Sequence, residues 1–306
     1  MITADPISIV SSMILSSTVP YPDTGETAWV SGTIYAKGAK VSYQIAGVYH
    51  RFESLQDSNQ NHFPEKYPNE NLWWLDLGYV NKFAAFQNDR NTQTITASPY
   101  IVSIKPNVRF GSVAIGNVQA DTVTLEVLNG SDVVYTRTKN LKVRNVYDWF
   151  SWTYEPFYQS NGTVFSDLPI NSTNTIKLTI SDGSGTVKVG SIIAGIPIDI
   201  GSAQYGTAIR RQNFSTFERD EFGETKITIR RNIPRVNFRL VIDKKKLNNT
   251  QRLLDEINGI VTYFSGIVET DHGYFDSVFL IGLYKDISYS LDMPNYASAE
   301  IEIEAL

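Results

Sequence analysis

The chain has 306 residues, a formal net charge of -5 at neutral pH and no cysteine. The acidic balance argues against a nucleic-acid partner held by a general basic field. The lack of cysteine excludes disulfides and thiolate metal sites. Hydrophobic residues make up 42% of the chain and aromatic residues 12%, which indicates an ordered, β-rich protein and excludes a disordered one. The length predicts two or three domains, and we favour three.

The beginning of the chain gives no sign of a targeting or membrane segment. Residues 7–15 form a weakly apolar run, but Asp5 precedes them where a signal peptide carries Lys or Arg. No run in the chain approaches the ~18 apolar residues of a membrane helix. We therefore expect neither a secretion signal nor a membrane span.

The most distinctive local pattern lies between residues 20 and 78. It reads as three short strands with aromatic residues at their ends and a glycine turn at Gly38. Exposed aromatic rings are what a sugar site needs, because pyranose C–H groups pack on flat rings while polar groups bind the hydroxyls. The candidates for sugar binding are Trp29, Tyr35, Tyr49, Trp73 and Trp74.

The same aromatic residues have a second interpretation, as the core of a small unit that lacks disulfides. A small β-unit must bury its largest side chains to be stable, and we favour this interpretation for Trp29 and Tyr49. Trp73 and Trp74 are adjacent, so a strand directs them to opposite faces. We expect one of the two in the core and the other exposed.

This pattern resembles the small chitin-binding type of carbohydrate-binding module. The matching residues, in order, are Ala28-Trp29, Tyr35-x-x-Gly38-x-x-Val41, Val48-Tyr49 and the closing tryptophan. The resemblance implies an N-terminal arm and a carbohydrate-binding-like module over residues 1–95, with a cell-surface glycan as ligand. The polar, aperiodic residues 81–99 predict a linker after this module.

Residues 96–197 show the period-two alternation of short strands. The strands are expected at residues 101–104, 113–115, 122–128, 133–138, 175–180 and 187–195. Turn-forming residues at 129–132 and 182–185 each predict a hairpin. Short strands at near-regular spacing predict an antiparallel β-sandwich.

An aromatic cluster interrupts this second unit, with six aromatic residues in residues 149–158. Such a cluster is either a second ligand surface or a cover for the open end of a small core or a domain contact. We favour the second use, since apolar rings are most often buried by the protein itself.

Residues 198–306 read as a β-unit with one α-helix. The helix is expected between Lys244 and Gly259, with a cap at Asn248 or Asn249 and an apolar face of Leu253, Leu254 and Ile257. Residues 278–289 read as a strand broken at Gly282. Residues 299–304 read as the closing strand, with Ile inward and Glu outward. The predicted fold class is mostly β, built from three small β-rich units.

The last third resembles the closing module of tail and baseplate proteins of bacteriophages and prophages. The matching residues are Gly206, Ser215, Asp220-Glu221-Phe222-Gly223, Arg230, Gly282-Leu283-Tyr284-Lys285-Asp286-Ile287 and the terminal Glu302-Ile303-Glu304-Ala305-Leu306. Ile281 and Ile287 depart from the pattern, which has aromatic residues at both places. The resemblance implies a structural protein of the virion tail, assembled in the host cytoplasm.

The partners implied are other copies of the chain, as a ring or fibre adaptor, other tail or baseplate proteins, and a host-surface glycan. We expect the last unit to hold the oligomer, so that deleting residues 1–95 leaves it intact. In this interpretation the acidic face of the closing strand meets Arg210-Arg211 and Arg230-Arg231 of a neighbouring copy.

No motif predicts a catalytic site, a metal site or a cofactor. His50, His62 and His272 each lack a second ligand at helical or hairpin spacing. A glycosidase carboxylate pair would involve Asp76 or Asp220-Glu221, but small β-units give no long scaffold around a cleft. We therefore expect no enzyme. The alternative function is a soluble carbohydrate-binding protein or the binding part of a glycan hydrolase.

Overall fold

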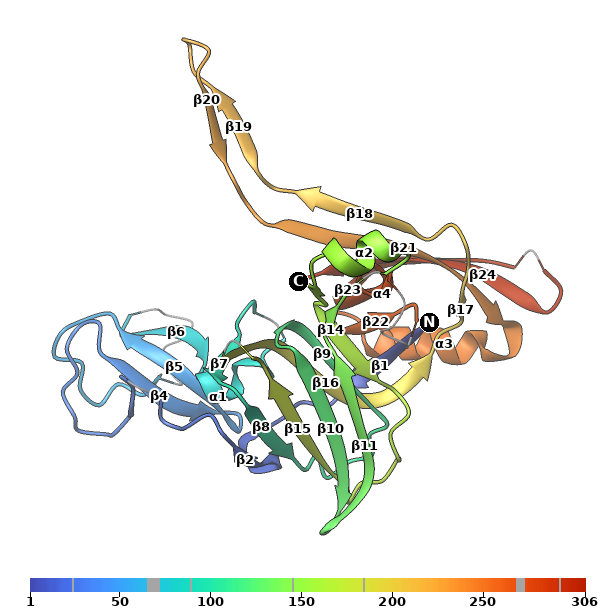
Figure 1. The fold of residues 1–306 in the computed structure, drawn as a ribbon. Helices are drawn as coiled ribbons and strands as arrows, with labels where there is room; N and C mark the ends of the chain where they lie inside the picture. The colour runs from blue at the N-terminus through green and yellow to red at the C-terminus, as the bar shows by residue number, and fades with distance from the viewer. Residues whose placement is uncertain are drawn as a thin grey trace. The chain divides into compact units, whose positions relative to one another are not determined.

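The computed structural model describes residues 1–23, 25–64, 72–88, 90–144, 146–183, 185–267, 273–291 and 293–306 (Figure 1). The fold is mostly β, as predicted. The chain divides into two compact units: a sandwich unit, Ile7–Ala194, and a C-terminal unit, which combines Gly195–Leu306 with Met1–Pro6. No helix in the described ranges has the length and apolar character needed to cross a membrane.

The sandwich unit contains the predicted antiparallel β-sandwich. One sheet has the strand order β11-β10-β15-β8-β2, and the other is formed by β14-β9-β16 with β7 paired to β16. The strands are β2 (Ile14–Ser17), β7 (Thr94–Ala97), β8 (Tyr100–Ile104), β9 (Ser112–Gln119), β10 (Thr122–Asn129), β11 (Asp132–Asn140), β14 (Gly162–Phe165), β15 (Thr175–Ser181) and β16 (Thr186–Asp199). Alternate residues of both sheets meet in one apolar core, exemplified by Leu125, Leu178, Ile115 and Val189.

The two predicted hairpins have different outcomes. Residues 129–132 connect β10 to β11, which pair antiparallel, as predicted. The predicted hairpin at 182–185 is wrong, because β15 pairs with β8 and β10 whereas β16 pairs with β7 and β9. This turn carries the chain from one sheet of the sandwich to the other. Turn residues indicate a reversal of direction, but they do not say which sheet the next strand joins.

The predicted linker at residues 81–99 is also wrong. The short helix α1 (Asn81–Ala84) and strand β7 occupy this segment. Phe83, Ala85 and Phe86 lie in the sandwich core, although polar residues surround them in the sequence. Burial of these few apolar side chains against the β-sheets outweighs the polar composition.

A four-stranded sheet within the sandwich unit has its own small core. Its order is β3-β4-β5-β6, with β3 (Thr27–Ala28), β4 (Lys40–Ile45), β5 (Val48–Ser54) and β6 (Trp74–Tyr79). Its core consists of Tyr35, Val41, Phe52 and Trp74. A 3₁₀ turn at Ser11–Met13 precedes β2.

The C-terminal unit is one sheet with helices packed on it. Its order runs from the end of β16 through β1, β22, β23 and β24 to β21, and β21 pairs with both β17 and β18. Its other elements are β1 (Ile2–Pro6), β17 (Ser202–Ala203), β18 (Ala208–Asn213), β19 (Thr216–Arg219), β20 (Thr225–Thr228), β21 (Asn232–Asp243), α3 (Lys244–Glu256), β22 (Thr262–Ser265), α4 (Phe275–Val278), β23 (Phe279–Ser290) and β24 (Tyr296–Ala305).

Strand β1 changes the expected domain plan. Because β1 pairs with both β16 and β22, the first six residues belong to the C-terminal unit. The predicted boundary at 197–198 lies close to the division between the two units at 194–195. Deleting residues 1–95 would remove this inner strand as well, so the expectation that the C-terminal unit holds the oligomer stays a prediction that this truncation does not test cleanly. No local sequence pattern signals a pairing between residues so far apart in the chain.

Helix α3 confirms the expected helix but not its cap. The helix begins at Lys244, and Asp243 caps it by accepting a hydrogen bond from the Lys245 N–H at 2.9 Å. The cap predicted at Asn248 or Asn249 is wrong, because β21 ends where the helix starts and its last residue serves as the cap. Leu254 and Ile257 are buried in the core of the unit.

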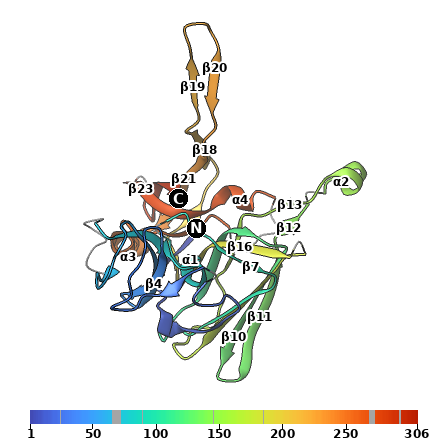
Figure 2. The same ribbon diagram turned by 90° about the vertical axis from the view of Figure 1, so that its left-hand side faces the viewer.

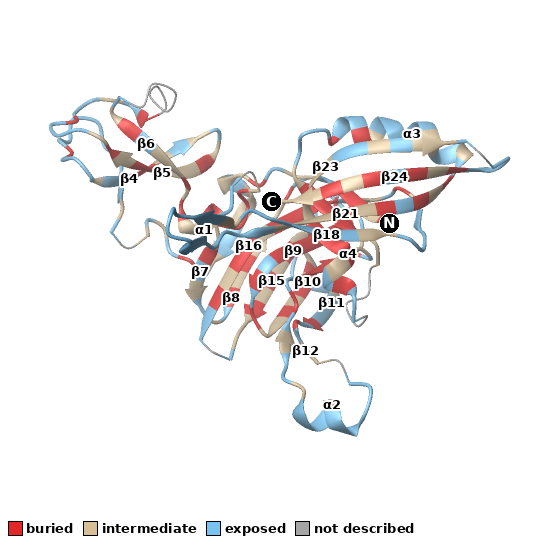
Figure 3. Cartoon of the chain, turned by 90° about the horizontal axis from the view of Figure 1, so that it is seen from above, coloured by how far each residue is buried: buried red, intermediate tan, exposed pale blue. Residues whose placement is uncertain are grey.

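Strand β23 runs through Gly282 without a break, contrary to expectation. A Cβ at Gly282 would clash with the backbone of Glu304 and Ala305 on β24, which accounts for the glycine. The irregularity in register instead falls between Tyr284 and Asp286. Along β24, Ile301 and Ile303 are buried while Glu300 is exposed, as predicted. Figure 3 shows buried and less buried stretches alternating along this strand.

The acidic face of β24 has partners in its own sheet. Arg239 Nε lies 2.9 Å from Glu300 Oε1, and Arg235 and Lys285 lie within 3.0 Å of Glu304 Oε2. The hydrogen bond from Lys285 and the nearby Arg235 hold the pKa of Glu304 below its ordinary value. These carboxylates therefore have ion-pair partners within their own sheet, and the expected contact with arginines of a neighbouring copy stays a prediction.

Replacing Leu254 by Asp tests the packing of α3. The change places an unpaired charge in an apolar contact and should lower the free energy of unfolding of the C-terminal unit by about 3–5 kcal/mol. Gln251→Asp, on an exposed position of the same helix, is the matched control and should change it by less than about 0.5 kcal/mol. Urea unfolding followed by circular dichroism measures both. Equal midpoints for the two variants would contradict the helix packing.

Candidate functional site: an exposed aromatic loop

The five predicted sugar-binding residues do not form one exposed platform. Trp74 and Tyr35 are buried in the core of the four-stranded sheet, with ring centroids 5.5 Å apart. Trp29 is half-buried against Phe63 and Tyr43. Each of these rings is used by the small sheet itself, in keeping with the core interpretation preferred for Trp29.

Tyr49 and Trp73 are also half-buried by neighbours within the sandwich unit. Tyr49 packs against Tyr21 and Phe83, and Trp73 stacks on His62 with ring centroids 3.6 Å apart. Of the adjacent tryptophans, Trp74 is the core residue and Trp73 keeps partial exposure. Trp73 is thus the member of the pair whose ring is partly accessible to solvent.

Exposed aromatic residues gather instead in residues 146–157, which we call the aromatic loop. Strands β12 (Lys142–Val143) and β13 (Tyr158–Gln159) pair antiparallel and bring its two ends together. Helix α2 (Trp149–Tyr154) lies at the far end of this ribbon (Figure 2). Its aromatic residues Tyr147, Trp149, Phe150, Trp152, Tyr154 and Phe157 are all exposed.

The exposure of these rings contradicts one form of the favoured expectation. They do not cover the open end of the sandwich core, since Trp149 is 81% exposed and none of the six belongs to that core. The use as a domain contact stays a prediction, and the exposed rings are available as the ligand surface named as the alternative from sequence.

Local hydrogen bonds, rather than tertiary packing, organise the aromatic loop. Ser151 N–H donates to Asp148 Oδ1 at 2.6 Å, and the N–H groups of Tyr147 and Asp148 both donate to Ser151 Oγ at 3.0 Å. This reciprocal arrangement is a capping box, which satisfies N–H groups at the helix start. Apart from the buried Ser151, every side chain of α2 is exposed.

Asp148 is held as a carboxylate by the same contacts. The hydrogen bonds from the Ser151 backbone and side chain lower the pKa of Asp148 below its ordinary value. A charged acceptor therefore stands at the start of α2 at neutral pH.

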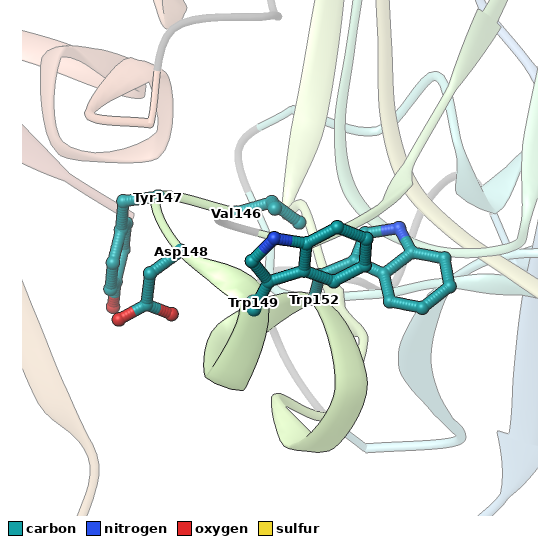
Figure 4. Close-up of a pocket in the computed structure, with 5 residues that line it drawn as sticks. All are labelled: Val146, Tyr147, Asp148, Trp149 and Trp152. Carbon is teal, nitrogen blue, oxygen red and sulfur yellow. The ribbon is translucent and has the colours of Figure 1, made fainter.

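An open pocket lies at this end of the loop, lined by Val146, Tyr147, Asp148, Trp149 and Trp152 (Figure 4). The rings of Trp149 and Trp152 meet edge to face, with centroids 5.6 Å apart and planes at 79°. Figure 4 shows the two indoles side by side, with Asp148 and Tyr147 together to their left. An edge-to-face pair covers at most one face of one ring, so flat ring surface stays accessible.

This set of groups suits recognition of a sugar better than catalysis. The indole faces provide apolar contact, while the indole N–H groups, the Tyr147 hydroxyl and the Asp148 carboxylate provide donors and an acceptor for hydroxyl groups. The lining holds one carboxylate, whereas glycoside hydrolysis normally uses two.

Asp76 and Asp220, which the sequence offers as candidates for catalysis, accept hydrogen bonds from neighbouring groups of the fold. Burial acts to raise the pKa of Asp76, but hydrogen bonds from His50 and the Gly78 N–H hold it below its ordinary value. Asp220 Oδ1 accepts from the N–H groups of Phe222 and Glu224 in an exposed turn. His272 lies outside the described residues.

The sequence contains a further signal for the loop. Asp148-x-x-Ser151, at the beginning of the aromatic run, is a pattern that starts a helix, and the count of aromatic residues alone does not reveal it. Comparisons of the chain with protein-family models, with curated proteins and with solved structures find no match. The chemistry of its own residues therefore carries the case for function.

The capping box predicts a pH-dependent loop. Because the pKa of Asp148 is lowered in the folded loop, the stabilisation is fully present above the ordinary carboxyl pKa of about 3.9 and is lost as pH falls through the lowered value. The near-UV circular dichroism of the Trp149–Trp152 pair should stay constant from neutral pH to about pH 4 and decrease below it. Asp148→Ala should show the decreased signal at pH 7, whereas Asp132→Ala, at an exposed turn, should not. An unchanged spectrum in Asp148→Ala would contradict this role.

The two adjacent tryptophans should differ in their effect on stability. Trp74→Ala empties the centre of the small core and should cost about 3–5 kcal/mol, while Trp73→Ala removes a half-buried ring and should cost clearly less. Chemical unfolding of both variants gives the comparison. Glycan retention measured on folded Trp73→Ala then tests whether the N-terminal module binds sugar. Equal losses of stability in the Trp73 and Trp74 variants would reject a sugar site at these tryptophans.

Proposed function

We propose that this chain is a structural protein of a bacteriophage or prophage tail or baseplate that contacts a host-surface glycan through its aromatic loop. The observation that carries the proposal is the exposed pair Trp149 and Trp152 beside the carboxylate of Asp148. In this role the chain acts without catalysis, as part of a virion assembled in the host cytoplasm. Its partners are further copies of itself, other tail or baseplate proteins and the glycan.

The cost of exposing the loop supports a binding role. Large apolar side chains in contiguous exposed patches are uncommon on proteins that have no partner, because water contact is unfavourable. The loop concentrates six such rings on and beside a short helix that has almost no buried side chain. Binding of a ligand that covers the rings therefore removes apolar surface from water. This favourable contribution to the free energy is not available to the protein alone.

A neutral glycan is favoured over other ligands by the polar groups beside the rings. A pyranose presents a C–H face to an indole and hydroxyl groups around its edge, which the Asp148 carboxylate and the indole N–H groups complement. The loop residues 146–157 contain two carboxylates, Asp148 and Glu155, and no lysine or arginine. An anionic ligand would thus find no positive charge within the loop.

Self-association would raise the effective affinity of a shallow site for a glycan surface. An open pocket with two stacking rings is expected to hold a sugar weakly, and many copies on one particle raise the effective affinity without new contacts. The β19–β20 arm of the C-terminal unit, which carries exposed apolar side chains, supports such self-association.

The second candidate is a soluble carbohydrate-binding protein or the binding part of a glycan hydrolase. The aromatic loop supports it equally, since sugar recognition is common to both. The two candidates differ in assembly: a tail protein forms oligomers at micromolar concentration, whereas a soluble binding module stays monomeric.

Loss of the indole rings tests the glycan contact. The double variant Trp149→Ala/Trp152→Ala should bind insoluble chitin or peptidoglycan at least tenfold more weakly than the parent protein, equivalent to about 1.4 kcal/mol. Its circular dichroism and unfolding midpoint should be unchanged, since both side chains are exposed. The exposed Tyr205→Ala, far from the loop in sequence, serves as the control for nonspecific apolar adsorption.

Two results would contradict the glycan contact. If neither the parent protein nor the control is retained by either polysaccharide, the chain has no site for these glycans. If retention persists in the double variant and disappears in Trp73→Ala, the sugar site lies in the N-terminal module instead.

A further inference from the structure

The β19–β20 hairpin forms an exposed arm, residues 214–231, beyond the end of β18. None of its residues is buried, and all but Ser215 and Thr216 are exposed. Figure 1 shows the arm projecting from the sheet of the C-terminal unit where β18 and β21 end. An isolated two-stranded ribbon is at best marginally stable in water, so the arm needs a surface to pack on.

One face of the arm carries Phe217 and Ile227 together with Arg219, and the other carries Glu218 and Lys226. Phe217 lies directly opposite Ile227, and Glu218 lies opposite Lys226. Residues directly opposite in an antiparallel pair point to the same side, so the two pairs occupy alternate faces. Phe222 at the tip is 92% exposed and extends the apolar surface.

The tip of the arm is acidic. Asp220, Glu221 and Glu224 surround Phe222, and none of the three has an ion pair among the described residues. The turn is well organised, because Asp220 accepts backbone hydrogen bonds from Phe222 and Glu224. A partner surface that fits the tip is therefore apolar and basic.

Such a surface lies at the other end of β21, at the turn between β23 and β24. Leu291, Met293 and Tyr296 are exposed there. Lys244 N–H bonds to the Asn295 carbonyl at 3.1 Å, which places the start of α3 beside this turn. We call Leu291, Met293 and Tyr296 with Lys244 and Lys245 the turn patch.

The arm and the turn patch lie at opposite ends of one rigid strand. Asn232 of β21 pairs with Asn213 next to the arm, whereas Asp243 pairs with Tyr296 of the turn patch. The twelve residues of β21 span roughly 37 Å at the usual rise per residue. The arm of one molecule is therefore too far from the turn patch of the same molecule to pack on it.

We propose that copies of this chain join head to tail, with the arm tip of one copy packed on the turn patch of the next. The inference rests on the self-association proposed above and names the surfaces that make it. Apolar contact among Phe217, Phe222 and the turn patch supplies affinity, while the tip carboxylates facing Lys244 and Lys245 fix the orientation. Two arms placed against each other would instead bring like charges together.

The size of the contact approaches that of a specific interface. Phe217, Phe222 and Tyr296 are 67%, 92% and 49% exposed, so covering them removes about 300–500 Å² from water. The neighbouring Ile, Leu and Met side chains and the charged groups of both surfaces add to this area, toward the ~1,000 Å² of a specific interface. Because the two surfaces differ, the contact is heterologous, and it closes into a ring if the rotation between copies permits.

Mixing two full-length variants tests the head-to-tail contact. The arm variant is Phe217→Ser/Phe222→Ser and the turn variant is Leu291→Ser/Met293→Ser, all at exposed positions. Sedimentation at micromolar concentration should show the parent protein as an oligomer and each variant alone as a monomer. The equimolar mixture should form dimers and nothing larger, since only the intact arm of one variant fits the intact turn patch of the other.

A charge exchange provides the second readout. Glu221→Lys/Glu224→Lys and Lys244→Glu/Lys245→Glu should each weaken assembly at least tenfold at low salt, and the quadruple variant should recover it. The lysine changes place carboxylates at a helix start, where they are compatible with folding.

The outcomes separate this inference from the proposed function. A monomeric parent protein would overturn both self-association and the head-to-tail contact. An oligomeric parent with a turn variant that assembles normally, or a mixture without dimers, would overturn the head-to-tail contact alone. Circular dichroism identical to that of the parent confirms that each variant is folded.

Discussion

The pairing of β21 with β24 is the interaction on which the C-terminal unit depends. Val236 opposite Ile303 and Phe238 opposite Ile301 face the core, while Arg235 opposite Glu304 and Arg239 opposite Glu300 face outward. A slip of one residue would place arginines in the core, so this register is strongly specified. The same pairing fixes α3 and the turn patch at one end of β21 and the arm at the other. The exposed arm and turn patch, which we propose face another copy, are thus positioned by a core that is complete within one molecule.

Local patterns in the sequence predicted those elements whose signals are local. The alternation of Ile and Glu predicted β24, the apolar spacing at Leu254 and Ile257 predicted α3, and the turn at 129–132 predicted one hairpin. Other features depend on contacts between distant residues: β1 joins β16 and β22, and β15 and β16 belong to different sheets. No window of sequence contains both partners of such a contact, which explains these errors.

The same contrast between local sequence signals and contacts of distant residues applies to the candidate site. Composition identified the aromatic residues, but whether a ring is core or surface depends on what covers it in three dimensions. Trp74 and Trp149 are the same residue type in similarly aromatic stretches, yet one is buried and the other 81% exposed. The capping contacts of Asp148 and Ser151 explain how a short helix persists without a core of its own. A sequence pattern predicts that helix start, but it does not predict the exposure of the rings that follow.

The position of β1 sets an order for folding during synthesis. The first six residues leave the ribosome early, but their partner β22 ends at Ser265. At about 5–20 residues per second, β1 waits roughly 10–50 s for that partner. The sandwich unit, Ile7–Ala194, is complete before then and lies between β1 and the rest of its sheet along the chain. The sandwich therefore folds as an inserted domain, and the C-terminal sheet closes only after β22 has been made.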